Sequence, residues 1–137
     1  MSAGEIIGLD VGQVRTGLAR ASSMAKLAEP LTTIPTDQLT SRLKKLANQG
    51  TSQIVVGLPR NLAGGDTAQT RWLRQWIKSA KAIIPEVKFY LQDEALTSLE
   101  ARSKKLESSK HVDEHAVAAA LILQDWLDQS DRRRQVA

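Results

Sequence analysis

Acidic residues stand where apolar runs end in three separate parts of the chain. Asp10 closes the run IIGLD just before Gly12, the pair Asp93-Glu94 follows VKFYLQ, and Asp113 precedes a long apolar helical pattern. Carboxylate oxygens are the ligands that hard cations such as Mg²⁺ and Mn²⁺ prefer. Two such ions about 4 Å apart stabilise the attacking and leaving oxygens of a phosphodiester displacement. These residue types therefore predict a divalent-metal site for phosphodiester chemistry.

Each acidic residue also has a simpler structural interpretation. Asp close to Gly is frequent in hairpins, so Asp10 could start a turn. Asp93 or Glu94 could cap the helix that follows them. Asp113 could favour the positive end of a helix dipole. Taken singly, each residue leaves both interpretations open.

The spacing of apolar residues predicts the elements that must position these side chains. Alternating or continuous apolar runs predict strands, and apolar residues three and four apart predict helices. The expected strands are Glu5–Leu9, Thr16–Ala21, Glu29–Ile34, Gln53–Leu58 and Val87–Leu91. The expected helices are Asp37–Gln49, Ala95–Leu106 and Val112–Leu127, together with one that begins at a capping box formed by Asp66 and Gln69 and runs to Ala80. The stretch Glu107–Lys110 is expected to be a mobile connection.

This order predicts an α/β fold in which a five-stranded mixed sheet is flanked by helices. Right-handed crossovers place the strands from Gln53 and Val87 parallel to the first strand. Ligands of parallel sheets bind beyond the carboxyl ends of the strands, where Asp10, the run Gly57–Asn61 and Glu94 are expected. Asp113 joins them if its helix begins at the same edge. Gly12 would let the backbone approach a metal or phosphate closely.

Composition bounds the class of protein. The 137 residues predict one domain, 1–137, with 130–137 as a disordered tail, and a net charge of +4 with a pI near 9.6 favours a polyanionic partner. The chain contains no cysteine, which excludes disulfides and thiolate metal sites. Neither a signal peptide nor a membrane span is expected, so the predicted location is the cytoplasm.

Other types of site receive less support. No Walker loop is present, and the glycines around Gly64 lack the lysine that such a loop requires. His111 and His115 are spaced as zinc ligands can be, but no third ligand of matching pattern accompanies them. Solvent-facing histidines are therefore expected, with His111 as a proton carrier near the site.

Four separated segments resemble the YqgF family, also called RuvX or Holliday junction resolvase, which has a three-layer ribonuclease H-like fold. They span nearly the whole chain in the family's order, which makes chance agreement improbable. The segments are IIGLDVGQVRTGLAR, IVVGLPRNLAGGD, QDEALTSLEA and VDEHAVAAALILQDWLD.

The resemblance implies specific site residues. The family's catalytic, metal-binding carboxylates carry over to Asp10, Glu94 and Asp113, with Mg²⁺ or Mn²⁺ as the cofactor and Asp93 as an open alternative to Glu94. The residues expected to contact substrate are Gly12, Arg15, Arg60, Asn61, Thr97 and Arg102.

The resemblance also implies a nuclease, a hydrolase that acts on phosphodiester bonds. The expected role is processing of the 5′ end of pre-16S ribosomal RNA in ribosome biogenesis, with structured RNA or pre-ribosomal particles as partners. Resolution of four-way DNA junctions and a non-catalytic RNA-binding role in ribosome assembly remain alternatives. Junction resolution requires two symmetric sites, and the sequence leaves open a monomer or a homodimer.

The chain departs from the family pattern at two places. Ala95 stands where the family usually has arginine, and Ala21-Ser22-Ser23 stands where it usually has an acidic residue. A missing arginine weakens phosphate contact, for which Arg60 or Arg102 could substitute.

Overall fold

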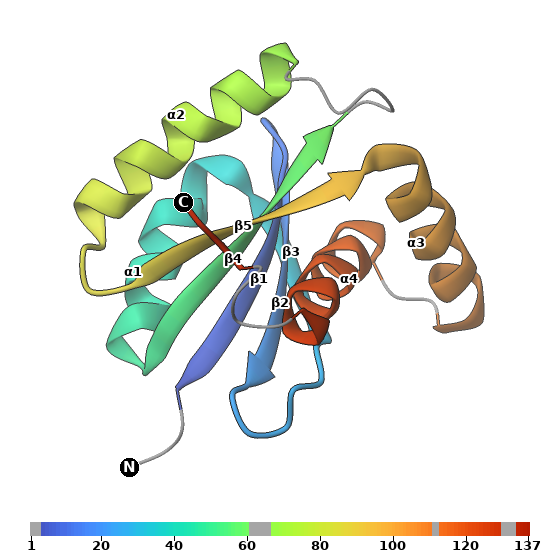
Figure 1. Ribbon diagram of the computed structural model, residues 1–137, viewed down its shortest axis with the longest axis horizontal. Helices are drawn as coiled ribbons and strands as arrows, with labels where there is room; N and C mark the ends of the chain where they lie inside the picture. The colour runs from blue at the N-terminus through green and yellow to red at the C-terminus, as the bar shows by residue number, and fades with distance from the viewer. Residues whose placement is uncertain (1–3, 61–66, 111–112, 130–133) are drawn as a thin grey trace.

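A mixed β-sheet with helices on both faces forms the architecture (Figure 1). The computed structural model describes residues 4–60, 67–110, 113–129 and 134–137, except for the side chains at 60, 96–97 and 106–110. The strands are β1 Glu5–Val11, β2 Arg15–Ser22, β3 Glu29–Pro35, β4 Thr51–Arg60, β5 Lys88–Ala95 and β6 Gln135–Val136. The helices are a 3₁₀ turn at Thr36–Gln38, α1 Leu39–Asn48, α2 Ala68–Ile83, α3 Leu96–Lys110 and α4 Glu114–Asp128.

The strands lie in the order β3-β2-β1-β4-β5-β6. The first three form an antiparallel meander, whereas β4 runs parallel to β1 and β5 runs parallel to β4. The parallel strands predicted from Gln53 and Val87 are thereby confirmed. Their carboxyl ends share the edge of the sheet at which β1 ends at Val11.

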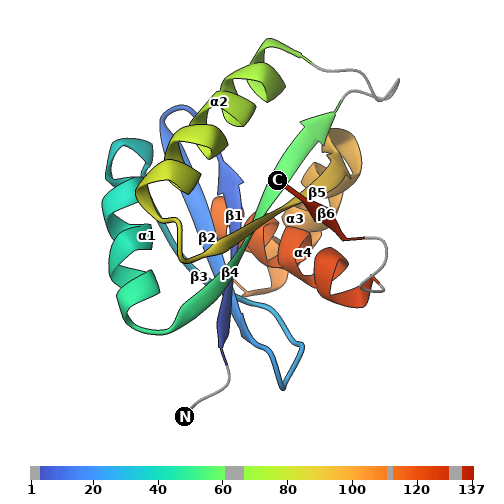
Figure 2. The same ribbon diagram turned by 60° about the vertical axis from the view of Figure 1, so that its left-hand side comes forward.

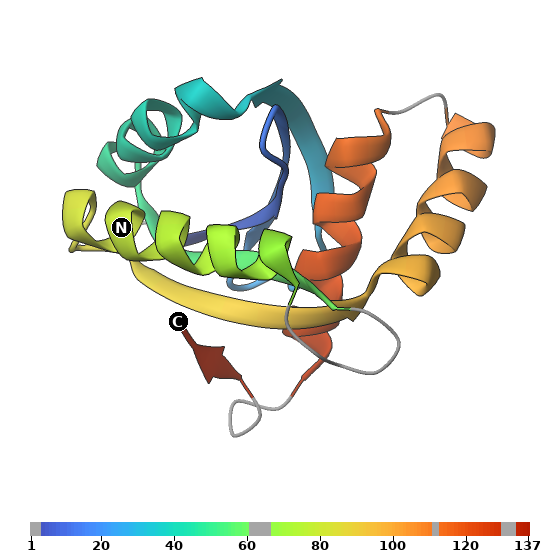
Figure 3. The same ribbon diagram turned by 90° about the horizontal axis from the view of Figure 1, so that it is seen from above.

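Side-chain alternation divides the sheet into two unlike faces, which Figure 3 shows edge-on. Helices α1 and α2 cover one face, where large aliphatic side chains such as Ile7, Leu9 and Val56 pack with Leu43 and Leu73. Helix α4 crosses the other face, with α3 outside it. Since successive side chains of a strand point to opposite faces, Asp10 lies on the α4 face with Ile6 and Gly8.

Glycines allow α4 to lie very close to the sheet. A Cβ at Gly17 would collide with the backbone carbonyl of His115, and one at Gly8 would lie 2.6 Å from Cβ of Leu123. A Cβ at Gly57 would collide with the side chain of Ile122. Helix α4 therefore begins over β2 and crosses β1 and β4 toward β5, where Trp126 packs on Tyr90 with ring centroids 5.0 Å apart.

The predicted ribonuclease H-like arrangement is confirmed, but the sheet has six strands and not five. The sixth strand, β6, lies within residues 130–137, which the sequence predicts to be a disordered tail. It pairs antiparallel with Tyr90 and Leu91 of β5 (Figure 2). The backbone N–H of Ala137 donates to the Phe89 carbonyl at 3.0 Å. The Arg134 guanidinium lies 3.9 Å from the ring centroid of Trp126. These long-range contacts leave no signal in the local pattern.

Two local predictions are wrong. The stretch Glu107–Lys110, expected as a mobile connection, belongs to α3. The helix continues to Lys110 because this stretch contains no glycine or proline that would end it. The capping box of α2 is formed by Thr67 and Thr70, whose hydroxyls each accept from the other's backbone N–H, and not by Asp66 and Gln69. Asp66 lies outside the described residues.

Candidate active site

Asp10 lies within β1 and not in the turn that follows. It is paired with Gly17 of β2, and the turn is closed by a 3.0 Å hydrogen bond from Gly12 N to the carbonyl of Arg15. The simpler interpretation of Asp10 as a turn residue is therefore not what the structure shows. A Cβ at Gly12 would lie 2.7 Å from that same carbonyl, so the turn itself accounts for this glycine.

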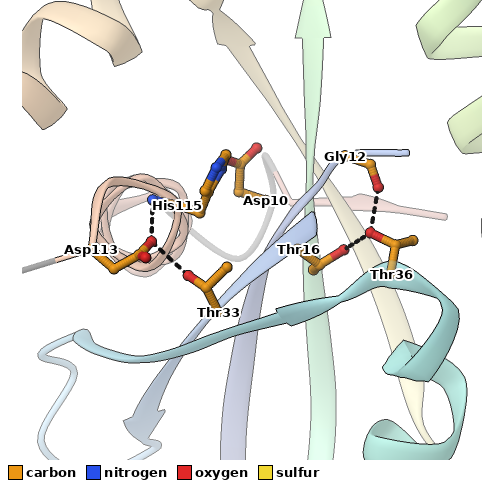
Figure 4. A network of polar contacts seen from close by, with 7 residues as sticks. All are labelled: Asp10, Gly12, Thr16, Thr33, Thr36, Asp113 and His115. Atoms are coloured by element: carbon orange, nitrogen blue, oxygen red, sulfur yellow. Dashed lines mark hydrogen bonds and ion pairs between the residues drawn. The ribbon is translucent and has the colours of Figure 1, made fainter. Parts of the chain in front are cut away.

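The Asp10 carboxylate faces the start of α4 (Figure 4). Its Oδ2 lies 3.9 Å from Nδ1 of His115. Burial raises the pKa of Asp10, the charge of His115 lowers it, and repulsion from Glu114 raises it again. A partly buried carboxylate with a second carboxylate nearby favours a cation as neighbour.

Asp113 caps α4 on the other side of the helix start, as Figure 4 shows. Its Oδ1 accepts from the backbone N–H of His115 at 2.9 Å and from the Thr33 hydroxyl at 2.6 Å. These hydrogen bonds, that of Thr33 foremost, lower the pKa of Asp113. The sequence predicts only a favourable position of Asp113 at the helix dipole; the structure shows that it caps α4 and that its carboxylate is bound to Thr33 of β3.

Glu94 lies on the same face of the sheet as Asp10, whereas the alternation of β5 turns Asp93 to the opposite face. The Glu94 side chain is only 8% exposed, and its Oε1 has no hydrogen-bond partner among the described residues. The pKa of Glu94 is raised to about 8, mainly by burial. A hydrogen bond to Asp125, together with charge repulsion from it, contributes to this rise. Neither member of the pair caps α3, because both belong to β5, which continues to Ala95.

The structure does not gather the three predicted ligands into one group. Thr33, which binds Asp113, is on β3 and Glu94 is on β5, each two strands from Asp10. Adjacent strands are about 4.8 Å apart, so each separation is of the order of 10 Å. Along the described chain, three or more acidic, histidine or cysteine side chains nowhere converge as a metal cluster.

A pocket opens beside Asp10, between α3 and the first turns of α4. Its volume is about 360 Å³. It is lined by Asp10, Leu99, Glu100, Ser103, Lys104, Glu114, His115 and Ala118. The Asp10 carboxylate therefore borders a space large enough for part of a substrate.

Asp10 and Glu114 provide a donor set that fits a magnesium or manganese ion. Both carboxylates line the pocket, and their repulsion contributes to the raised pKa of Asp10. Mg²⁺ is commonly held by one or two carboxylates, with water and substrate phosphate as its other ligands. Asp10 and Glu114 meet that requirement at the pocket, whereas Asp113 is bound by Thr33 and the backbone of His115, and Glu94 lies two strands away on β5.

The residues expected to contact substrate are distributed unevenly. Arg15 is exposed at the hairpin end and lies two positions from Gly17, so it shares the α4 face. Arg60 ends β4 and Thr97 belongs to α3, but their side chains, like the whole of Asn61, lie outside the described part. The Arg102 guanidinium binds both oxygens of Asp125, at 2.9 and 3.0 Å, rather than facing Asp10.

The sequence predicts only Asp10 among the eight described residues that line the pocket. Glu114 and His115 directly follow Asp113, but only the contact of α4 with Gly17 brings them beside Asp10. Ser103 lies in the middle of α3 and has no motif around it. His111, expected as a proton carrier, lies outside the described residues.

In the described ranges, no helix is long and apolar enough to cross a membrane.

The sheet order and the acidic side chains on the α4 face define the class as a ribonuclease H-like α/β domain. The RuvC protein of T. thermophilus, solved in complex with a Holliday junction substrate, matches the fold with a TM-score of 0.63 at 12% identity. The match covers 98% of this chain and 99% of that one. At this identity, the likeness concerns the fold.

The family model described as "RuvX: Holliday junction resolvase" matches residues 4–129, and the chain belongs to this family. A "Putative pre-16S rRNA nuclease" of Rubrobacter xylanophilus is 34% identical, over 91% of this chain and 93% of the relative. One of the same name from Mycolicibacterium paratuberculosis is 37% identical, over 92% and 81%. Family membership makes the chain a nuclease, a hydrolase of phosphodiester bonds.

Proposed function

We propose that this protein is a divalent-metal-dependent ribonuclease that processes the 5′ end of pre-16S ribosomal RNA. The observation that carries the proposal is the pocket beside Asp10, which brings Asp10, Glu114 and His115 together at the start of α4. The names of the curated relatives support the RNA substrate. The net charge of +4 is consistent with a polyanionic partner.

In this proposal, Asp10 and Glu114 hold the metal ion, which is Mg²⁺ or Mn²⁺. When bound, the ion stabilises the negative charge that develops on the reacting phosphate. Asp10 is kept in place by its pairing with Gly17, and His115 by the contact of its carbonyl with the same glycine. Glu94 and Asp113 enter the proposal as further ligands through the family resemblance.

The chain's basic residues have a separate part. Arg15 is exposed on the face that carries Asp10, at the end where substrate would enter. Its guanidinium would bind a phosphate of the RNA, a contact that weakens as salt rises. The Arg102 guanidinium binds Asp125, which in turn interacts with Glu94.

The test is cleavage of a pre-16S RNA leader by purified protein with Mn²⁺, Mg²⁺ or EDTA. Asp10→Asn should lower the rate at least about 100-fold, because it removes a charge that the reacting centre needs. Asp93→Asn is the matched control, since Asp93 lies on the opposite face and its change should leave the rate within about twofold. Cleavage by Asp10→Asn at the wild-type rate would refute the proposed site.

Cleavage of four-way DNA junctions is the second candidate, favoured by the description of the family model. It requires two active sites related by symmetry. A junction substrate in the same assay, with the molecular mass of the complex measured, separates the two candidates. RNA bound by wild type and Asp10→Asn alike, with no cleavage by either, would instead indicate the non-catalytic assembly factor.

A further inference from the structure

The wall of the Asp10 pocket contributed by α3 takes no part in the proposed metal binding. Leu99 and Ser103 are four residues apart, as are Glu100 and Lys104, so all four lie on neighbouring stripes of one helix. They line the pocket together with Ala118 of α4. The volume of about 360 Å³ lies within the usual range of ligand pockets, roughly 300–1,000 Å³.

The lining combines apolar surface with hydrogen-bond acceptors. Leu99 and Ala118 are buried and offer apolar contact, whereas Glu100 and Glu114 are exposed carboxylates. Lys104 is the only lysine or arginine among the described residues that line the pocket. Three carboxylates against one ammonium group repel a phosphate but accept N–H donors, so the lining fits an uncharged polar ring.

Ser103 supplies a second, independent observation. Its side chain is 6% exposed, and its hydroxyl has no hydrogen-bond partner within the described structure. Buried polar groups are rarely left without a partner, because each one costs free energy. A hydroxyl that lacks a partner in the wall of a pocket indicates a ligand with a polar edge.

We propose that this pocket binds one unpaired nucleobase of the substrate strand, next to the phosphate that is cut. Leu99 and Ala118 contact the ring, Glu100 accepts hydrogen bonds from its edge, and Ser103 bonds a further polar atom. Guanine presents two adjacent N–H donors, which match the two oxygens of a carboxylate, so it binds more tightly than uracil. The proposal rests on the proposed function for the position of the cut beside Asp10.

The first test is metal-free, so that it reports the pocket and not the metal site. The ¹⁵N-labelled protein is titrated in EDTA with guanosine, uridine and ribose, which carry no phosphate for the carboxylates to repel, and amide shifts are recorded. Guanosine should shift the amides of Leu99–Lys104 and of Glu114–Ala118, with a Kd at least about threefold below that of uridine. Equal binding of all three compounds, or shifts confined to other elements, would overturn the proposal.

Variants sharpen this test. Glu100→Gln should weaken binding of guanosine about tenfold, since a charged acceptor is lost, and Ser103→Ala about threefold. Ser103→Ala should fold normally, because it removes a buried group that has no partner. Glu86→Gln and Ser79→Ala, both exposed and outside the pocket, should leave the Kd unchanged. Unchanged affinity in Glu100→Gln and Ser103→Ala would refute the base-binding role.

Cleavage of the RNA leader separates this proposal from the proposed function. If Asp10→Asn abolishes cleavage while Ser103→Ala and Glu100→Gln keep the wild-type preference for the base beside the cut, the base pocket is refuted and the nuclease stands. If guanosine binds the pocket as expected but no RNA is cleaved, the nuclease proposal is refuted and the base pocket stands.

Discussion

The two faces of the sheet are built from different kinds of side chain. Under α1 and α2, Ile7, Leu9 and Leu58 are fully buried among other large aliphatic residues. Under α4, the strands instead present glycines and alanines, such as Gly17 and Ala19. The acidic residues Asp10 and Glu94 occur on this second face.

This difference separates stability from placement. Large aliphatic side chains on the first face contribute the transfer free energy of burial, about 25 cal/mol per Å². Small residues on the second face bury less apolar area. They instead determine the position of α4, because its backbone carbonyl at His115 lies directly against Gly17. The candidate site is positioned by this second kind of contact.

A cavity on the first face should lower stability without changing the chemistry. Leu73→Ala in α2 removes a side chain that is fully buried, and should cost about 2–5 kcal/mol in the free energy of unfolding. The cleavage rate per folded molecule should stay near that of wild type, because α2 does not contact the Asp10 pocket. Urea unfolding and cleavage at low temperature measure the two effects. Loss of cleavage in the folded variant would contradict the separation of the faces.

The buried acid on the second face should make stability depend on pH. The pKa of Glu94 is raised from 4.5 to about 8, so the folded state holds a proton that the unfolded state releases above about 4.5. Its contribution is therefore complete below pH 4.5 and is lost as pH rises toward and through 8, a change of the order of a few kcal/mol. Glu94→Gln should make this slope shallower in urea unfolding between pH 5 and 8, leaving the smaller part due to the raised pKa of Asp10, and an unaltered slope would show that Glu94 does not contribute.

A methyl group between β2 and α4 should disturb the site itself. Gly17→Ala places a Cβ against the backbone of His115, which cannot move without shifting the start of α4. We expect a loss of about 1–3 kcal/mol in stability and a fall in cleavage rate. Gly57→Ala is the matched control on the same face, because its Cβ meets the flexible end of Ile122. Equal losses of activity in both variants would argue against a specific role for the Gly17 contact.

Asp113 offers the smallest and most selective change. Asp113→Ala should cost about 1 kcal/mol, because the cap of α4 is lost, whereas Asp113→Ser keeps a capping oxygen and should retain most of that stability. If Asp113 is also a metal ligand, Asp113→Ser should still lose cleavage, since its charge is removed. Cleavage at the wild-type rate by a stable Asp113→Ser would limit this residue to capping. Thermal unfolding and the RNA assay give the two readouts.

The sequence predicts five of the strands and all the main helices from local periodicity, and predicts from the handedness of crossovers that β4 and β5 run parallel to β1. It also identifies Asp10 and the Asp93-Glu94 pair as acidic strand ends, and the alternation of β5 separates the members of that pair. It does not predict which carboxylates meet, because that depends on the diagonal course of α4. His115 and Ser103 reach the pocket by this packing of helices.

Both margins of the sheet resist the addition of another strand. At one margin, β6 occupies part of the hydrogen-bonding edge of β5. At the other, β3 contains Pro30 and Pro35, which have no N–H to offer an incoming strand. A second copy of the protein would therefore have to associate through helices or loops. In a dimer that cuts a symmetric junction, those surfaces would set the spacing of the two sites, and a continuous intermolecular sheet would not.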